Sequence, residues 1–203
     1  MFRNLPPATR AIILTNALVF LLQYLTRGAF DGMFALQPLG SYFEPWQLVT
    51  YAFLHANFPH IFFNMFAVFM FGSELERFAG TRRFVVLYLA SVLAAAAVQL
   101  ATAAWSGLQE STIGASGGVF GLLLAFALLF PRQRLVLFPV PIPLPAWLFV
   151  TLYGLLELVL GVTGTQAGVA HFAHLGGMLG GALVIAWWRF QARPRGPYSR
   201  GPY

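Results

Sequence analysis

Long runs of apolar residues, separated by short polar breaks, dominate this chain. Six runs are long enough, or nearly so, to cross a hydrocarbon core of about 30 Å. Backbone N–H and C=O groups in lipid must be satisfied within the segment, so each run is expected to be a helix. The runs cover approximately residues 11–25, 60–78, 84–105, 116–130, 146–162 and 169–188. The predicted fold class is all-α: a polytopic membrane bundle of six transmembrane helices.

The arginines predict the orientation of this bundle. The chain has no lysine, and arginine supplies its net charge of +6. With six crossings, one side of the membrane receives the arginines at positions 3, 10, 77, 82, 83, 132, 134, 189, 193, 195 and 200, and the other receives Arg27. By the positive-inside rule, both termini are expected in the cytoplasm. No A-x-A-like site follows the first run, so no cleavable signal is expected. A bacterial cytoplasmic (inner) membrane is the expected location.

Composition excludes several classes of protein. The chain is 59% hydrophobic and 9% charged, far from the range of soluble domains. It has no cysteine, which excludes disulfides and thiolate metal sites. A basic balance in so apolar a chain favours anionic lipid headgroups, and no nucleic-acid partner is expected. We expect one membrane domain over residues 1–190 and a disordered basic tail over 191–203.

Two connections carry information. The segment 27–50 is too apolar for a soluble loop and too broken by Gly and Pro to span, so it is expected to lie in the outer interface. The inner segment FPVPIPLP, residues 138–145, has a proline at every second position, which favours an extended polyproline-like connector.

Four polar side chains within the apolar runs are candidates for function, because burying them in a membrane is costly. Counted along each helix from the first inner arginine, and at about 1.5 Å per residue, they lie at similar depths of roughly 20, 26, 24 and 23 Å for Asn64, His60, Ser116 and His174. The fourth run begins at that depth. The non-helical backbone before it, residues 111–115, is tolerable where it lines a water-filled cavity.

Glycine spacing predicts that these side chains meet. Small residues four apart occur at Gly117 and Gly121 in the fourth run, and at Gly176/Gly180 and Gly177/Gly181 in the sixth. Such faces allow two helix backbones to approach closely, which would bring Ser116 within hydrogen-bond reach of His174. A serine beside a histidine base is the arrangement for nucleophilic acyl transfer. Free N–H groups at the start of the helix, with His60 and Asn64, could stabilise an oxyanion.

The motifs GASG (114–117), AHLGGMLGG (173–181) and HANFPHIFFN (55–64), in this arrangement, resemble the rhomboid family of intramembrane serine proteases. The resemblance implies Ser116 as nucleophile and His174 as general base. It implies His60, Asn64 and the Ser116 amide as oxyanion donors. Supporting positions are Gly114, Gly117, Phe120, Gly177, Gly181, His55 and His171. It implies no metal and no cofactor, and membrane-anchored protein substrates that are cut within or next to a locally unwound transmembrane helix.

Three positions need comment beside this resemblance. Gln47 follows Trp46 where the family often has Arg, which puts the anchoring of the first loop in doubt. Phe120 replaces a frequent tyrosine one turn after the serine and is expected to stack on the ring of His174. The family dyad uses no carboxylate. The intramembrane Glu157 is expected to be a buried, protonated, structural hydrogen-bonding group rather than a catalytic acid.

Other interpretations stay open. An isolated serine among glycines is ordinarily a small packing residue, and buried histidines are ordinarily structural. One alternative is a non-proteolytic rhomboid-like protein that binds membrane clients. Another is a haem- or metal-binding membrane protein that uses His55, His60, His171 and His174. A transporter is disfavoured, because the helices show neither an internal repeat nor charged residues along a path.

Overall fold

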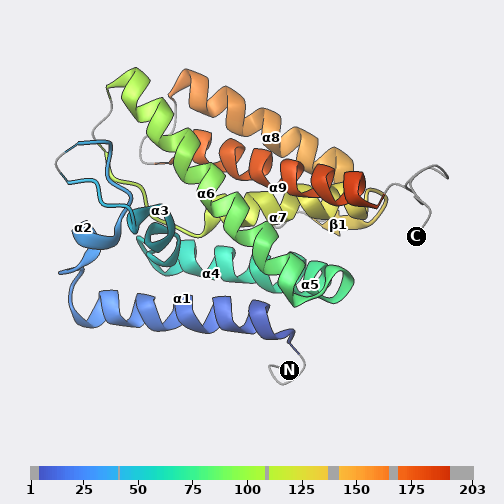
Figure 1. The fold of residues 1–203 in the computed structure, drawn as a ribbon, viewed down its shortest axis with the longest axis horizontal. Helices are drawn as coiled ribbons and strands as arrows, with labels where there is room; N and C mark the ends of the chain where they lie inside the picture. Colours follow the sequence, from blue (N-terminus) through green and yellow to red (C-terminus); the bar gives the residue numbers. More distant parts are fainter. Residues whose placement is uncertain (1–4, 41, 108–109, 137–141, 165–168, 193–203) are drawn as a thin grey trace, which may run out of the picture.

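A computed structural model describes residues 5–40, 42–107, 110–136, 142–164 and 169–192. It is a bundle of helices with one short sheet (Figure 1). The elements are α1 (Pro7–Leu25), α2 (Asp31–Phe34), α3 (Gln47–Thr50), the 3₁₀ turn η2 (Tyr51–Phe53), α4 (Phe58–Ala67), the π-helical turn η3 (Val68–Gly72), α5 (Ser73–Ala79), α6 (Thr81–Ser106), α7 (Ser116–Leu129), β1 (Arg134–Val136), β2 (Pro143–Pro145), α8 (Ala146–Thr163) and α9 (His171–Gln191).

Helices occupy all six segments that the apolar pattern predicts. Four of them are long and apolar enough to cross a membrane: α1, the continuous α4–η3–α5 rod, α6 and α8. Helix α7 is apolar but has 14 residues, and α9 has 21 residues with a less apolar sequence. The chain is therefore a membrane protein with several apolar helices. Six crossings and two cytoplasmic termini stay predictions, although Figure 1 shows the start of α1 and the end of α9 at the same end of the bundle.

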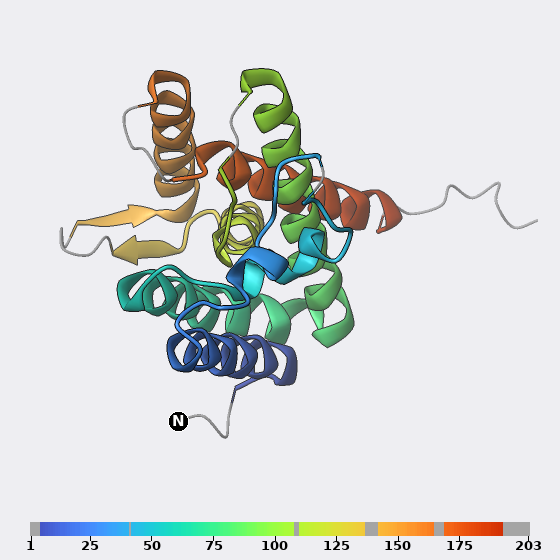
Figure 2. The same cartoon turned by 90° about the vertical axis from the view of Figure 1, so that its left-hand side faces the viewer.

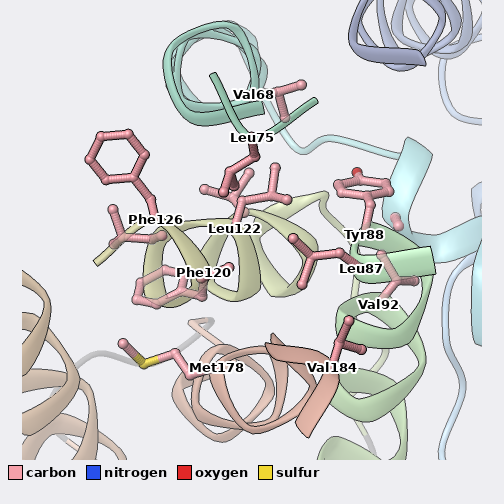
Figure 3. Close-up of a cluster of buried hydrophobic side chains, with 14 of the residues drawn as sticks. Val68, Leu75, Leu87, Tyr88, Val92, Phe120, Leu122, Phe126, Met178 and Val184 are labelled. Carbon is pink, nitrogen blue, oxygen red and sulfur yellow. The ribbon is translucent and has the colours of Figure 1, made fainter. Parts of the chain in front are cut away.

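Helix α7 lies in the middle of the bundle. Figure 2 shows it end-on, with α4, α6, α8 and α9 around it. Its residues pack against neighbours on several sides (Figure 3), and the cluster joins Phe120, Leu122 and Phe126 of α7 to Val68, Leu75, Leu87, Tyr88, Val92, Met178 and Val184. A helix that is apolar all round is the kind that a bundle can surround. The element that begins with Ser116 is thus the most enclosed one.

Glycines set the distance between α7 and its neighbours. A Cβ atom added to Gly177 of α9 would overlap the backbone carbonyl of Gly117 in α7, and one added to Gly181 would lie 2.5 Å from the carbonyl oxygen of Gly121. The other glycine pair of α9 faces α6, where a Cβ on Gly180 would lie 2.7 Å from a backbone oxygen. The predicted small-residue faces therefore contact two different helices.

The connections differ in part from their predictions. The loop after α1 contains α2, α3 and η2. In the connection between α7 and α8, β1 pairs with β2 in antiparallel fashion, with Leu135 opposite Leu144, so residues 143–145 are extended as expected. The rest of the proline-rich segment and the basic tail lie mostly outside the described residues.

Two charged side chains bond to the backbone at the ends of other helices. Glu76 of α5 is buried and accepts hydrogen bonds from the backbone N–H groups of Ala8 and Thr9, at 2.9 and 2.7 Å. These are donors in the first turn of α1, which have no acceptor within their own helix. Arg189 of α9 donates to the carbonyl oxygen of Leu128 near the end of α7, at 2.8 Å. Both bonds join elements that are far apart in the sequence.

The glycine contact gives a prediction. Gly177→Ala is expected to lower the stability of the fold by about 3 kcal/mol, because the new methyl group meets backbone that cannot move aside without separating α7 from α9. The matched control is Gly32→Ala in α2, where an added Cβ has no atom within 4 Å. Thermal unfolding in detergent measures both variants. Equal midpoints for the two would contradict the assigned role of this contact.

Candidate active site

Ser116 and His174 meet at the buried contact between α7 and α9. The Oγ atom of Ser116 lies 2.8 Å from Nε2 of His174, a hydrogen-bond distance. Ser116 is the first residue of α7 and is half-buried, whereas His174 is 9% exposed and lies in the first turn of α9. The closeness that depth and glycine spacing predict is present in the structure.

The backbone before α7, residues 111–115, is non-helical, as predicted. Thr112 forms an antiparallel bridge with Leu36, and the N–H of Gly114 donates to the carbonyl oxygen of Tyr51 at 2.9 Å. Gly114 has a φ of +125°, a backbone conformation that residues other than glycine rarely adopt. The helix then starts at Ser116, so the N–H groups of its first turn have no acceptor within α7. The N-terminal end of α7, which carries partial positive charge, therefore lies beside the hydroxyl of Ser116.

The ring of His174 is held on one face and at its second nitrogen. Phe120 stacks on it, with ring centroids 4.2 Å apart and planes within 6°, which confirms the predicted stacking. Nδ1 of His174 lies 2.8 Å from Oε2 of Glu157 in α8. Since Nε2 is the atom that faces Ser116, both ring nitrogens are engaged. The imidazole therefore has one defined orientation.

The His60 ring lies against Gly114. A Cβ atom on Gly114 would lie 2.8 Å from Nε2 of His60 and 3.7 Å from Oγ of Ser116, so both atoms border the same small space. The backbone N–H of Ala56 points at Nδ1 of His60 at 3.5 Å, which favours a neutral ring with its proton on Nε2. Nε2 is also the nitrogen on the side of the ring that lies against Gly114.

Asn64 lies one turn further along α4 than His60, with its side chain 6% exposed. Its Nδ2 donates one hydrogen to the carbonyl oxygen of His60 at 2.9 Å. An amide nitrogen carries two hydrogens, so a second donor is left on Asn64. Asn57 caps the start of this helix by accepting from the N–H of His60 at 2.9 Å.

The two accessory histidines have different surroundings. His55 is 2% exposed and its ring meets that of His60 edge-on, with centroids 4.9 Å apart. Burial and the neighbouring His60 lower the pKa of the His55 imidazole to about 4, so it is uncharged at neutral pH. His171 is 5% exposed, and its Nδ1 lies 2.7 Å from the same Glu157 oxygen that His174 contacts.

Glu157, His171 and His174 also offer donor atoms within 4.8 Å of one another, a spacing that a metal ion can use. They are the one such group within the described ranges. The direct hydrogen bonds at 2.7 and 2.8 Å account for this spacing. The group includes two of the four histidines that the haem or metal interpretation needs.

The expectation for Glu157 from the sequence is incomplete. It is buried, as expected, but its partner is the very histidine that faces Ser116. One signal was present in the sequence. Glu157 lies 11 residues after Ala146, the start of its helix, and so about 17 Å along the helix, toward the level predicted for the other polar groups.

Gln47 anchors the first loop despite the absence of arginine at its position. Its side chain is 1% exposed and bonds to four backbone groups. Oε1 accepts from the N–H groups of Gln37 and Glu44 at 3.1 and 3.2 Å, and Nε2 donates to the carbonyl oxygens of Met33 and Tyr42, both at 3.2 Å. The side-chain amide of Gln47 therefore anchors the first loop, although the family often has arginine at this position.

The fold and site define a helical membrane protein with a serine–histidine pair at the start of a central helix. The chain belongs to the rhomboid family, because the Rhomboid domain model matches residues 42–191. That match contains every residue named in the three motifs.

Several relatives are named as rhomboid proteins or proteases. The chain is 32% identical over 145 residues to "Rhomboid protein 1, mitochondrial" of Saccharomyces cerevisiae, covering 67% of this chain and 40% of the relative. It is 36% identical over 92 residues to "Putative rhomboid protease YdcA" of Bacillus subtilis, covering 44% and 45%. It is 28% identical over 157 residues to "Rhomboid protease AarA" of Providencia stuartii, covering 68% and 54%. The chain thus spans about half the length of these relatives.

The loop gives a prediction that tests its anchoring. Gln47→Leu is expected to destabilise the protein by several kcal/mol, because it leaves two N–H and two C=O groups without their side-chain partner in a buried place, at about 1–3 kcal/mol each before relaxation. Trp46→Phe is the control. It removes a single hydrogen bond, from the indole N–H to the carbonyl oxygen of Met33, and the Trp46 side chain is 48% exposed. Thermal unfolding and limited proteolysis of the loop compare the two. A Gln47→Leu loop as resistant as wild type would refute the anchoring.

Proposed function

We propose that this chain is an intramembrane serine endopeptidase, with Ser116 as nucleophile and His174 as general base. The observation that carries the proposal is the 2.8 Å contact between Oγ of Ser116 and Nε2 of His174 at the start of an enclosed helix. Hydrogen-bond contact of this kind is what an activated serine requires. Membership of a family whose relatives are named proteases supports the same reaction class.

In the proposed reaction, Oγ of Ser116 attacks the carbonyl carbon of the scissile peptide bond. Its proton passes to Nε2 of His174, which then gives it to the leaving amine as the C–N bond breaks. A water molecule attacks the resulting ester, again through His174, and returns the acid and the free serine. The half-buried Ser116 at the recessed start of α7 is the point where such water would enter.

The tetrahedral intermediate of each step carries an oxyanion that needs hydrogen-bond donors. The backbone N–H of Ser116 lies at the positive end of α7 and is one donor. His60, with its Nε2 beside Gly114, and Asn64, with its second amide hydrogen, are the other two. Three donors from two helices would share the charge of the oxyanion.

Substrates of this enzyme would be proteins anchored in the membrane by a helix that is locally unstable. A peptide carbonyl in an intact helix is bonded to an N–H four residues on, so the helix must unwind before Ser116 can attack. Relatives come from a mitochondrial and from bacterial sources. Family membership therefore does not choose between these membranes, and the bacterial cytoplasmic membrane stays a prediction.

The proposal predicts the behaviour of two serine variants. Ser116→Ala is expected to lose cleavage by roughly 10⁴-fold or more, since loss of a nucleophile removes the whole covalent route. The control is Ser91→Ala in α6, a buried serine whose hydroxyl donates to the carbonyl oxygen of Leu87. It is expected to cleave like wild type. Reconstituted protein is incubated with labelled single-span membrane proteins, and products are identified by mass spectrometry.

An active-site serine probe on the same samples separates the remaining outcomes. Labelling of wild type and Ser91→Ala, but not of Ser116→Ala, supports an activated Ser116 even where the substrate panel is uncut. Equal cleavage by all three proteins would point to a contaminant or another catalytic centre and would refute the proposal. Neither cleavage nor labelling of the wild type would leave the client-binding alternative.

A further inference from the structure

Glu157 is a buried carboxylate that the serine–histidine reaction does not require. It is 4% exposed, it lies in α8, and the motifs that identify the family do not include it. We propose that Glu157 is a positioning residue for His174, so that Ser116, His174 and Glu157 act as a triad. This proposal rests on the proposed protease function and adds a third side chain to it.

The geometry is that of a chain of two hydrogen bonds through one imidazole. Ser116 Oγ lies 2.8 Å from Nε2 of His174, and Nδ1 of the same ring lies 2.8 Å from Oε2 of Glu157. The three residues come from α7, α9 and α8, so the arrangement depends on all three helices. The sequence spacing does not require this arrangement, because Glu157 lies 17 positions before His174 and in a different helix.

The partner of Nδ1 decides which nitrogen of His174 carries the proton. An ionised carboxylate only accepts hydrogen bonds, so it holds the proton of the neutral ring on Nδ1. Nε2 is then an unprotonated acceptor that faces the hydroxyl of Ser116, which is the tautomer a general base needs. A protonated Glu157 could instead donate to Nδ1, and the proton on Nε2 would then point at Ser116 and block the reaction.

His171 favours the ionised carboxylate. Its Nδ1 lies 2.7 Å from Oε2 of Glu157, the oxygen that His174 also contacts. One protonated oxygen could donate to only one of the two rings, whereas a carboxylate oxygen accepts from both. Two N–H donors at these distances are charge-assisted hydrogen bonds that offset part of the cost of burying the charge. The expectation of a protonated Glu157 is therefore replaced by an ionised one in the proposal.

The charge of Glu157 acts when His174 is protonated. As Ser116 attacks, its proton moves to Nε2, and the ring becomes an imidazolium whose positive charge faces the carboxylate 2.8 Å away. Glu157 keeps its charge throughout and receives no proton, as in soluble triads. In a surrounding of low dielectric this pairing stabilises the transition state more than it would in water.

The competing explanation is that Glu157 serves only as a structural link between α8 and α9. Two substitutions distinguish this role from the positioning of His174. Glu157→Gln keeps the shape and a hydrogen-bonding group but offers an N–H to Nδ1, which favours the wrong tautomer of His174. Glu157→Ala removes the partner and leaves the ring free to take either tautomer. A positioning role therefore predicts that Gln is worse than Ala for kcat. A structural role predicts the reverse order, because Gln preserves more contacts.

The experiment measures kcat, KM and thermal unfolding for wild type and both variants in proteoliposomes. Glu157→Gln is expected to lower kcat by about 10²- to 10⁴-fold with little change in KM, since Glu157 does not touch the substrate. Glu157→Ala is expected to lose less. Glu76→Gln is the matched control: this buried carboxylate bonds to α1 and α6, so the variant is expected to unfold at lower temperature with kcat unchanged.

Each outcome has one meaning. A Glu157→Gln variant that unfolds like wild type and has lost kcat supports the triad, even where Glu157→Ala does not fold. Wild-type kcat in a folded Glu157→Gln variant, or a larger loss in Ala than in Gln, overturns it. A wild type that neither cleaves nor labels with a serine probe overturns the protease function itself, a different result from an active wild type with an unaffected Glu157→Gln.

Discussion

The close approach of the α7 and α9 backbones is the constraint on which the site depends. A methyl group on Gly177 would overlap the backbone carbonyl of Gly117, so nothing larger than glycine fits at position 177 between the two helices. Only at that separation does Ser116, at the start of one helix, reach His174 in the first turn of the other. The same contact keeps Phe120 stacked on the imidazole, since Phe120 lies one turn below Ser116 on α7. Packing and chemistry are therefore set by the same few glycines.

A second constraint follows from the surroundings. Polar groups enclosed among apolar helices must find partners in the protein, because an unpaired one is costly. Glu157 meets this need for the Nδ1 atoms of His171 and His174, which both lie within hydrogen-bond distance of its Oε2. Glu76 does the same for backbone N–H groups in the first turn of α1, and Gln47 does it for four backbone groups in the first loop. Each of these polar side chains joins two segments and defines their relative position, which non-directional apolar packing alone does less well.

The sequence predicted the helices and the Ser116–His174 contact because both depend on quantities that run along the chain. Apolar length sets where a helix lies, residue number sets depth, and small residues four apart mark faces of close contact. The stacking of Phe120 on His174 followed from its position one turn after Ser116.

The partners of Glu157 and Gln47 could not be predicted in the same way. The depth of Glu157 was available, but the direction in which it points depends on the rotation of α8 about its axis, and that helix is apolar on every side. Gln47 bonds to backbone groups spread over residues 33–44, and loop backbone has no periodicity that would reveal them. Both partnerships are products of tertiary packing.

The bond between Arg189 and Leu128 has a consequence for the electrostatic field of α7. A helix carries partial positive charge at its N–H end and partial negative charge at its carbonyl end. The guanidinium of Arg189 meets the carbonyl end at 2.8 Å and offsets its negative pole. The opposite pole, with the N–H groups of the first turn, is directed into the space beside Ser116. The partial negative charge of the central helix is therefore offset by Arg189, while its partial positive charge is not. That positive charge attracts negative charge at the place where the proposed reaction would generate the oxyanion.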